Sequence, residues 1–246
     1  MTSKQLSLAT VAALLFGAVP ILRAQQPAAT AAGGAGDTVA ALKQSLQQGQ
    51  ALIRQYEWVE TTIISLKGEE KARKQNRVYY GADGKLQKTP IGEAAPPKQQ
   101  ASGGRGRGKV KAQVVENKKE DMQDYMQKAV ALVHQYVPPK PEQIQGAKDA
   151  GRIATNPQGE GRVRLEITQY LQPGDRLAVD VDAAAGRLLA LNVDTYLEKK
   201  DDAVTLAVQM ATLPDGALYA AQTTFEAKAK NIRVVVQNSG YRPIAK

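Results

Sequence analysis

The stretch that decides the fold begins at Val163 and ends at Asp194, and it reads VRLEITQYLQPGDRLAVDVDAAAGRLLALNVD. Apolar and polar residues alternate along most of it, which is typical of β-strands with one buried and one solvated face. Gln172–Asp175 contains Pro, Gly and Asp, and Ala183–Gly186 ends in Gly, so both segments are turn-forming. Because short turns join antiparallel neighbours, the stretch predicts an antiparallel meander.

The same pattern continues to Asn238, so the meander predicted from Gly161 onward has six strands. Its dry face is made of aliphatic side chains, and a face of this kind must be covered by another element. The residues predicted on it include Leu165, Ile167, Leu177, Val179, Val181, Leu189, Leu191, Val193, Leu206 and Val208.

The chain before the meander predicts a helix, three strands, a loop and two helices. The expected helices cover Asp37–Tyr56, a segment that begins near Asn117 and includes Met122–Tyr136, and a short segment from Pro141 to Ala150; the expected strands cover 56–66, 70–80 and 86–91. Asn156–Gly161 is expected to be a polar loop. This order predicts an α+β fold, in which helices cover one face of a large curved antiparallel sheet, an open half-barrel of about nine strands.

The N-terminal residues have the layout of a secretory signal. Lys4 precedes an apolar run from Leu8 to Val19, and Ala24 is a plausible cleavage residue. The run is shorter than the ~20 apolar residues that a membrane span needs, so we expect no membrane span after cleavage. We therefore expect a signal peptide over 1–24, a flexible leader over 25–36 and a single domain over 37–246. The chain contains no Cys, which excludes a lipid-modified cysteine and predicts a periplasmic or secreted protein without disulfides.

Positive charge is concentrated in one part of the chain. The formal net charge is +9, and the segment from Lys67 to Lys111 contains twelve Lys or Arg residues against four Asp or Glu. Part of this segment, residues 92–109, is rich in Gly and Pro and predicts a disordered basic insertion that carries Arg105 and Arg107. The strand expected over 70–80 carries Arg73, Lys74 and Arg77.

These cations predict either a solvated surface or a site for an anionic or protein partner. Arg105 and Arg107 among glycines resemble a nucleic-acid-binding tract, but an exported protein seldom meets nucleic acid. We therefore expect anionic envelope components rather than nucleic acid as partners of Arg73, Lys74, Arg77, Arg105 and Arg107.

The dry face of the sheet and the helix that bears Met122 predict either a filled core or a cavity for an apolar ligand. If a cavity is present, the only Trp is the foremost candidate for contact with the ligand. The predicted ligand-binding residues are Trp58, Ile64, Met122, Met126, Val133, Leu165, Ile167, Leu191, Leu206 and Val208.

No arrangement of residues predicts catalysis, a metal site or a cofactor. His134 is the only His, and a metal site needs several ligands. Asp180 and Asp182 are expected on the wet face of a strand and Asp201 and Asp202 in a turn, as solvated carboxylates. The sequence therefore predicts a non-enzymatic protein.

Three short strings resemble a group of uncharacterised bacterial envelope proteins: Gln55–Glu60, the hairpin through Gly81–Gly84, and Asn238–Pro243. The order of elements is also similar to the periplasmic lipoprotein-carrier (Lol-like) superfamily. This resemblance implies an open antiparallel half-barrel whose helices cover an apolar cavity. No lipoprotein-handling residue can be matched position by position.

Together, the residues and the resemblance predict a periplasmic protein that binds a lipid or a lipoprotein acyl chain between sheet and helices. The alternative is an interaction module of the envelope, whose basic strand and loop bind a protein or a polyanion.

Overall fold

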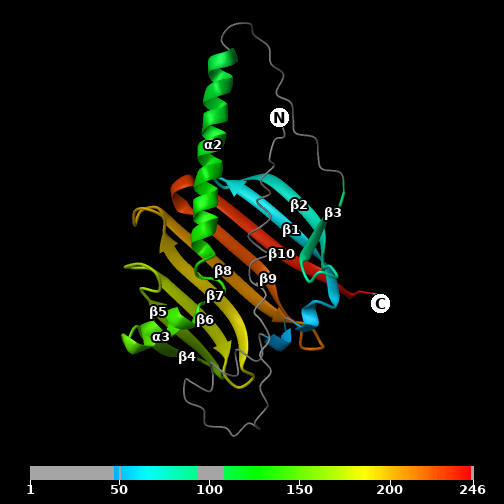
Figure 1. Ribbon diagram of the computed structural model, residues 1–246, viewed down its shortest axis with the longest axis vertical. Helices are drawn as coiled ribbons and strands as arrows, with labels where there is room; N and C mark the ends of the chain where they lie inside the picture. The colour runs from blue at the N-terminus through cyan, green and yellow to red at the C-terminus, as the bar shows by residue number, and fades with distance from the viewer. Residues whose placement is uncertain (1–46, 50, 93–107, 245–246) are drawn as a thin grey trace.

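The computed structural model describes residues 47–49, 51–92 and 108–244. All of its strands belong to one antiparallel sheet, with the order β3-β2-β1-β10-β9-β8-β7-β6-β5-β4 (Figure 1). The strands are β1 (Tyr56–Leu66), β2 (Glu69–Tyr80), β3 (Leu86–Pro90), β4 (Ile153–Gly159), β5 (Arg162–Thr168), β6 (Arg176–Asp182), β7 (Arg187–Tyr196), β8 (Ala203–Thr212), β9 (Leu218–Ala227) and β10 (Ile232–Pro243).

The sheet is open, because β3 and β4 lie at its two edges and do not pair with each other. A large, open antiparallel sheet with helices is therefore confirmed, and β5 to β10 are the six predicted strands of the meander. The expected number of strands, about nine, is wrong: the described residues form ten. The missed strand, β4, covers Asn156–Gly159, which the sequence predicted as a loop. It is an exposed edge strand that contains Pro157, so it lacks the apolar alternation by which strands are detected.

Two longer helices accompany the sheet, α2 (Gly108–Val133) and α3 (Pro141–Asp149), with a short 3₁₀ turn, η3 (Lys228–Lys230), before β10. Figure 1 shows α2 crossing one face of the sheet and extending past its edge. We call the face that α2 covers the inner face. The helix was expected to begin near Asn117 but begins at Gly108, because the Lys, Gln, Glu and Ala residues that make up most of residues 109–120 favour helix.

Of the helix predicted over Asp37–Tyr56, residues 47–49 and 51–56 are described: 47–49 and 51–53 are helical, whereas Arg54 and Gln55 form a turn and Tyr56 begins β1, so the predicted end at Tyr56 is wrong. A Cβ at Gly49 would lie 2.6 Å from the Leu218 Cβ. The helix therefore lies so close to β9 at this position that a side chain larger than that of glycine would clash. Residue 50, the part of this predicted helix before residue 47, the signal peptide, the leader and residues 93–107 lie outside the described residues.

The inner face and the C-terminal half of α2 form one hydrophobic core, which we call the main core. Met126, Ala129 and Val133 of α2 are all at most 3% exposed and pack against it. The sheet supplies the rest, including Ile167, Leu177, Val181, Leu191, Val193, Val204, Leu206, Val208, Phe225, Val234 and Val236. A bulge opposite Asp180 and Val181 shifts the register, so Leu188 rather than the predicted Leu189 is buried in this core.

A buried carboxylate fastens the end of α2 to the sheet. Asp175, 2% exposed, lies in the turn between β5 and β6. It accepts hydrogen bonds from the backbone N–H groups of Tyr170, Leu171 and Gln172 at 2.6–2.9 Å, and from the Tyr136 hydroxyl at 2.5 Å. Burial and the bond to Asp175 both raise the pKa of Tyr136. Since Tyr136 follows directly after α2, these bonds fix where the helix rests.

Candidate ligand site on the inner face of the sheet

A cluster of aromatic rings lies at the end of the sheet where β1 begins and β10 ends. The Trp58 ring stacks on the Tyr241 ring, with centroids 5.4 Å apart and an angle of 19° between the planes. The Tyr80 ring lies 6.0 Å from Trp58, and the Tyr219 ring lies 4.3 Å from Tyr241. We call these four residues the aromatic cluster. Trp58 and its cross-strand partner Val78 are buried, but neither belongs to the main core.

A backbone irregularity produces the stack. In the pairing of β1 with β10, Glu57 lies opposite Arg242 and Val59 opposite Ser239, so two residues of β10 face Trp58. One of them, Gly240, has a φ of +64°, a conformation that favours glycine. The extra residue returns Tyr241 to the side of Trp58. Burial is the largest reason for the raised pKa of Tyr241, so its hydroxyl stays neutral.

An ion pair lies next to the aromatic cluster on the same face. Glu60 is 2% exposed, and Lys88 of β3 donates to its two carboxylate oxygens at 2.8 and 2.7 Å. Asn76 of β2 lies directly opposite Glu60, with its amide nitrogen 3.5 Å from the carboxylate. Asn238 faces Glu60 from β10 and accepts a hydrogen bond from the Trp58 indole nitrogen at 3.1 Å. Polar groups therefore interrupt the apolar inner face at β1, β2 and β3.

Two further polar side chains, those of Thr62 and Lys74, lie next to these polar groups on the inner face. Thr62 lies two residues after Glu60 on the same strand and directly opposite Lys74, so their side chains share the inner face. Thr62 is 2% exposed, and its hydroxyl has no hydrogen-bond partner among the described residues. Lys74 is exposed and makes no ion pair within the part of the chain that the structure describes. We call Glu60, Thr62, Lys74, Asn76 and Lys88 the polar patch.

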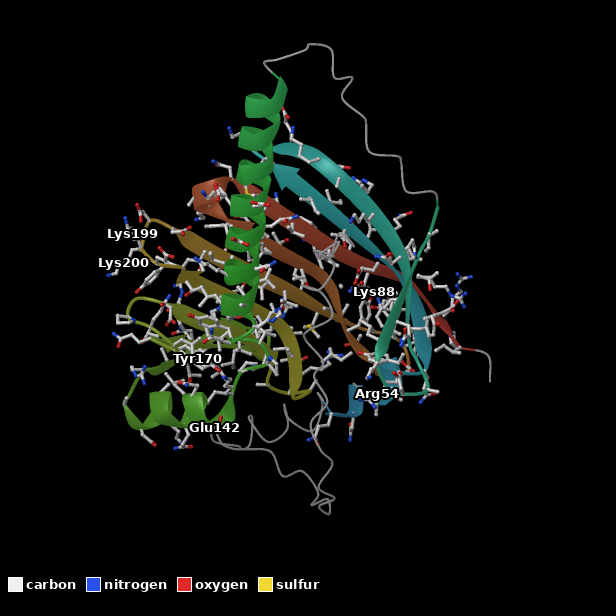
Figure 2. The ribbon with its side chains drawn as sticks, turned by 45° about the horizontal axis from the view of Figure 1, so that its top comes forward. Arg54, Lys88, Glu142, Tyr170, Lys199 and Lys200 are labelled. Atoms are coloured by element: carbon white, nitrogen blue, oxygen red, sulfur yellow. The ribbon has the colours of Figure 1, made fainter. Side chains whose placement is uncertain are left out.

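Figure 2 places Lys88 and Arg54 on one side of the molecule, opposite Lys199 and Lys200. The Arg54 guanidinium lies 5.7 Å from the centroid of the Tyr80 ring, within the range of a cation–π contact. Positive charge therefore borders the aromatic cluster as well as the polar patch.

The predicted ligand-binding residues divide into two groups. Six of them are buried inside the main core: Met126, Val133, Ile167, Leu191, Leu206 and Val208. Ile64, Met122 and Leu165 are partly buried against that core, and Trp58 alone belongs to the aromatic cluster. The structure thus brings nine of the ten together between the sheet and α2. Contact of any of them with a ligand stays a prediction.

The three predicted cations of β2 do not form one array. Arg73 and Arg77 lie on the outer face and pair with carboxylates: Arg73 with Glu70 at 2.8 Å, and Arg77 with Glu57. Lys74 lies on the inner face. Because their charges are balanced locally, Arg73 and Arg77 offer less to an anionic partner than the sequence indicates. Arg105 and Arg107 lie outside the described residues, so binding by the basic strand and loop stays a prediction.

A surface cleft of about 520 Å³ lies at the other side of the molecule, between α2, the turn after β7 and η3. Eight of its eleven lining residues are charged. Tyr125 donates to Asp202 at 2.5 Å, and the Lys230 ammonium lies 5.4 Å from the centroid of the Tyr125 ring. A cleft with these walls does not offer an apolar chain a favourable surface.

The remaining residues considered from the sequence have local roles. Burial lowers the pKa of His134, whose Nε2 atom is buried without a hydrogen-bond partner among the residues that the structure describes. Asp180 accepts two hydrogen bonds from Arg164 at 2.6 and 2.8 Å, and Asp182 pairs with Arg187 at 3.2 Å. Across the described ranges, no three His, Asp or Glu side chains gather as a metal site would require. In the same ranges, helices that combine the length and the apolarity of a membrane span are absent.

No family model matches the chain, and no curated protein matches its sequence. Solved structures that are similar to it include the following two. A DUF1329 family protein from Desulfovibrio piger is 16% identical, with 84% of this chain and 92% of that chain covered and a TM-score of 0.36. A LolA superfamily protein from Nitrosomonas europaea is 10% identical, with 82% and 94% covered and a TM-score of 0.35. A member of the superfamily that the sequence resembles is thus among the similar structures, at values that say nothing about what this chain binds.

Sequence reasoning missed most of the polar patch. Thr62 lies at alternate spacing with Trp58 and Ile64 in the sequence, and a Thr between two such residues is a usable signal of a polar position on a dry face. The pairing of Lys88 with Glu60 joins residues 28 apart on strands that are not direct neighbours. No local pattern predicts such a contact.

Proposed function

We propose that this chain is an exported, non-enzymatic protein that binds the apolar chain of an amphiphile against the inner face of β1, β2 and β10, beside Trp58. The observation that carries the proposal is the aromatic cluster, which is separate from the main core. The rings of Trp58 and Tyr241 present stacked apolar surface, while Tyr80 and Tyr241 remain only half-buried.

The main core is a less suitable place for a ligand. Val208 and Val133 are 1% and 2% exposed, and they are already packed between sheet and helix. A ligand there would have to displace α2, whose C-terminal end is fastened through Tyr136 and Asp175. At the aromatic cluster, each buried CH₂ of a ligand contributes about 0.8 kcal/mol without the loss of core contacts.

The secretory layout of the first 24 residues supports the assignment to the envelope, where acyl chains of lipids and lipoproteins are the abundant apolar ligands. The open edge of the sheet at β3 supports access from the side, since β3 lies next to β2 and, among the described strands, none lies beyond it.

Native mass spectrometry tests the proposal. Protein purified from its own host in gentle detergent-free buffer is expected to carry a lipid-sized adduct, and the stripped protein is expected to bind added medium-chain amphiphiles. A Trp58→Ala variant is expected to lose this binding, whereas Tyr79→Ala, which alters a ring of β2 on the outer face, retains it. Protein that carries no adduct and binds none of the added amphiphiles would show the proposal to be wrong.

A further inference from the structure

The polar patch contains a buried hydroxyl, that of Thr62, which makes no hydrogen bond to the described residues. More than nine-tenths of buried polar groups in folded proteins have a partner. Thr62 is 2% exposed on the inner face, and its buried hydroxyl has no partner among the described residues. A group left in this state costs stability, so its presence on the face proposed to receive a ligand points to an acceptor that arrives with the ligand.

The neighbours of Thr62 define the charge of that acceptor. Lys74 lies directly opposite, so the Cβ atoms of the two residues are about 5 Å apart. Its ammonium has no carboxylate partner in the described part of the chain, whereas the outer-face cations Arg73 and Arg77 both have one. The only carboxylate in the polar patch, Glu60, is held by Lys88 at 2.7 Å. The patch therefore carries two ammonium groups against one carboxylate.

We propose that Thr62 and Lys74 bind the anionic oxygens of the amphiphile's head group, a carboxylate or a phosphate, while its chain lies along Trp58. This inference rests on the proposed function and names the ligand class of that site. The Thr62 hydroxyl donates one hydrogen bond and the Lys74 ammonium a charge-assisted one. Glu60 does not repel the anion strongly, because Lys88 neutralises it.

Four soluble probes test the inference by calorimetry on the full chain: decanoate, decyl phosphate, decanol and inorganic phosphate. The first three share one chain length and differ in head group. We expect the chain to bind decanoate or decyl phosphate about tenfold more tightly than decanol. The tighter of the two anions identifies carboxylate or phosphate as the natural head group.

Substitutions identify the residues responsible. Lys74→Gln and Thr62→Val are each expected to weaken binding of the anionic probes by about tenfold while leaving decanol unchanged. Arg73→Gln is the matched control, since it removes a cation from the adjacent position on the outer face, and it is expected to leave all affinities unchanged. Because Lys74 is exposed, its variant is expected to fold normally, which keeps the test informative if Thr62→Val does not fold.

Different failures have different meanings. Equal affinity for decanol and the two anions, or an anion preference that survives Lys74→Gln, would overturn the head-group inference and leave the proposed function standing. Inorganic phosphate that binds in a Lys74-dependent way without any binding of the chain-bearing probes would support the anion site and overturn the proposed function. Absence of binding by all four probes would overturn both.

Discussion

The Lys88 ammonium lies 2.7 Å from a Glu60 carboxylate oxygen that is almost entirely shielded from solvent. Removal of one partner of a buried pair leaves the other charge uncompensated, which typically costs 3–5 kcal/mol. We therefore expect Lys88→Met to lower the free energy of unfolding by about 3 kcal/mol, measured by urea denaturation with Trp58 fluorescence. The double variant Glu60→Gln/Lys88→Met is expected to recover more than half of that loss. A single variant as stable as the parent would contradict the assignment of a buried, mutually dependent pair.

Thr62→Val is expected to stabilise the protein without ligand. Valine has nearly the same shape as threonine, and it removes a buried hydroxyl that has no partner in the described part of the chain. An unsatisfied buried group costs about 1–3 kcal/mol, so an increase in unfolding free energy of about 1 kcal/mol is expected by the same denaturation measurement. Thr223→Val, at another buried inner-face Thr two strands away, is a suitable comparison. Destabilisation by Thr62→Val would mean that the hydroxyl is bonded in the unliganded protein.

The Asp175 carboxylate is expected to contribute strongly to the stability of the fold. Asp175→Ala leaves three backbone N–H groups and the Tyr136 hydroxyl without their acceptor, and is expected to cost about 3 kcal/mol or more. Tyr136→Phe removes a single donor and is expected to cost about 1–2 kcal/mol. Asp215→Ala, in an exposed turn where the carboxylate accepts from Ala217 and Tyr56, is the control and is expected to cost less. Equal losses of unfolding free energy for Asp175→Ala and Asp215→Ala would show that the buried Asp175 carboxylate stabilises the fold no more than an exposed turn carboxylate does.

Protonation of His134 is expected to make the free energy of unfolding depend on pH. Its pKa is lowered by burial in the folded state, so the unfolded chain binds a proton more readily. Between the ordinary His pKa of about 6.5 and the lower folded value, the unfolded state therefore holds more protons, and stability falls as the pH falls. His134→Gln is expected to flatten this part of the profile when thermal unfolding is followed from pH 7.5 to pH 5. An unchanged slope in the variant would assign the effect to other groups.

The sequence predicts the strands of the sheet better than it predicts the candidate ligand site. The six-stranded meander follows from alternation and turn residues, and the buried positions of Leu191, Leu206 and Val208 follow with it. Strand β4 escapes detection because it is an edge strand that is exposed and polar almost throughout. Leu188 replaces Leu189 in the core because a bulge, which alternation cannot predict, shifts the register by one residue.

The candidate site depends on contacts between strands that are distant in the sequence. The alternation of β2 places Lys74 on the opposite face of the strand from Arg73 and Arg77. This alternation is already contained in the sequence. The carboxylate that balances Arg77 is Glu57 on the neighbouring strand, 20 residues away. The stack of Tyr241 on Trp58 needs the bulge at Gly240. A single sequence indicates the residue types, but the sheet register decides which of them meet.

The fluorescence of Trp58 provides the most direct test of the proposed binding site, because it is the only Trp of the chain. Decanoate with bromine on the chain is a short-range quencher, and its addition is expected to quench Trp58 in a saturable way. In Trp58→Phe/Tyr79→Trp the only Trp moves to the outer face of β2, where no quenching is expected at the same concentrations. Saturable binding by calorimetry without quenching of Trp58, or equal quenching in both proteins, would contradict a site on the inner face beside Trp58.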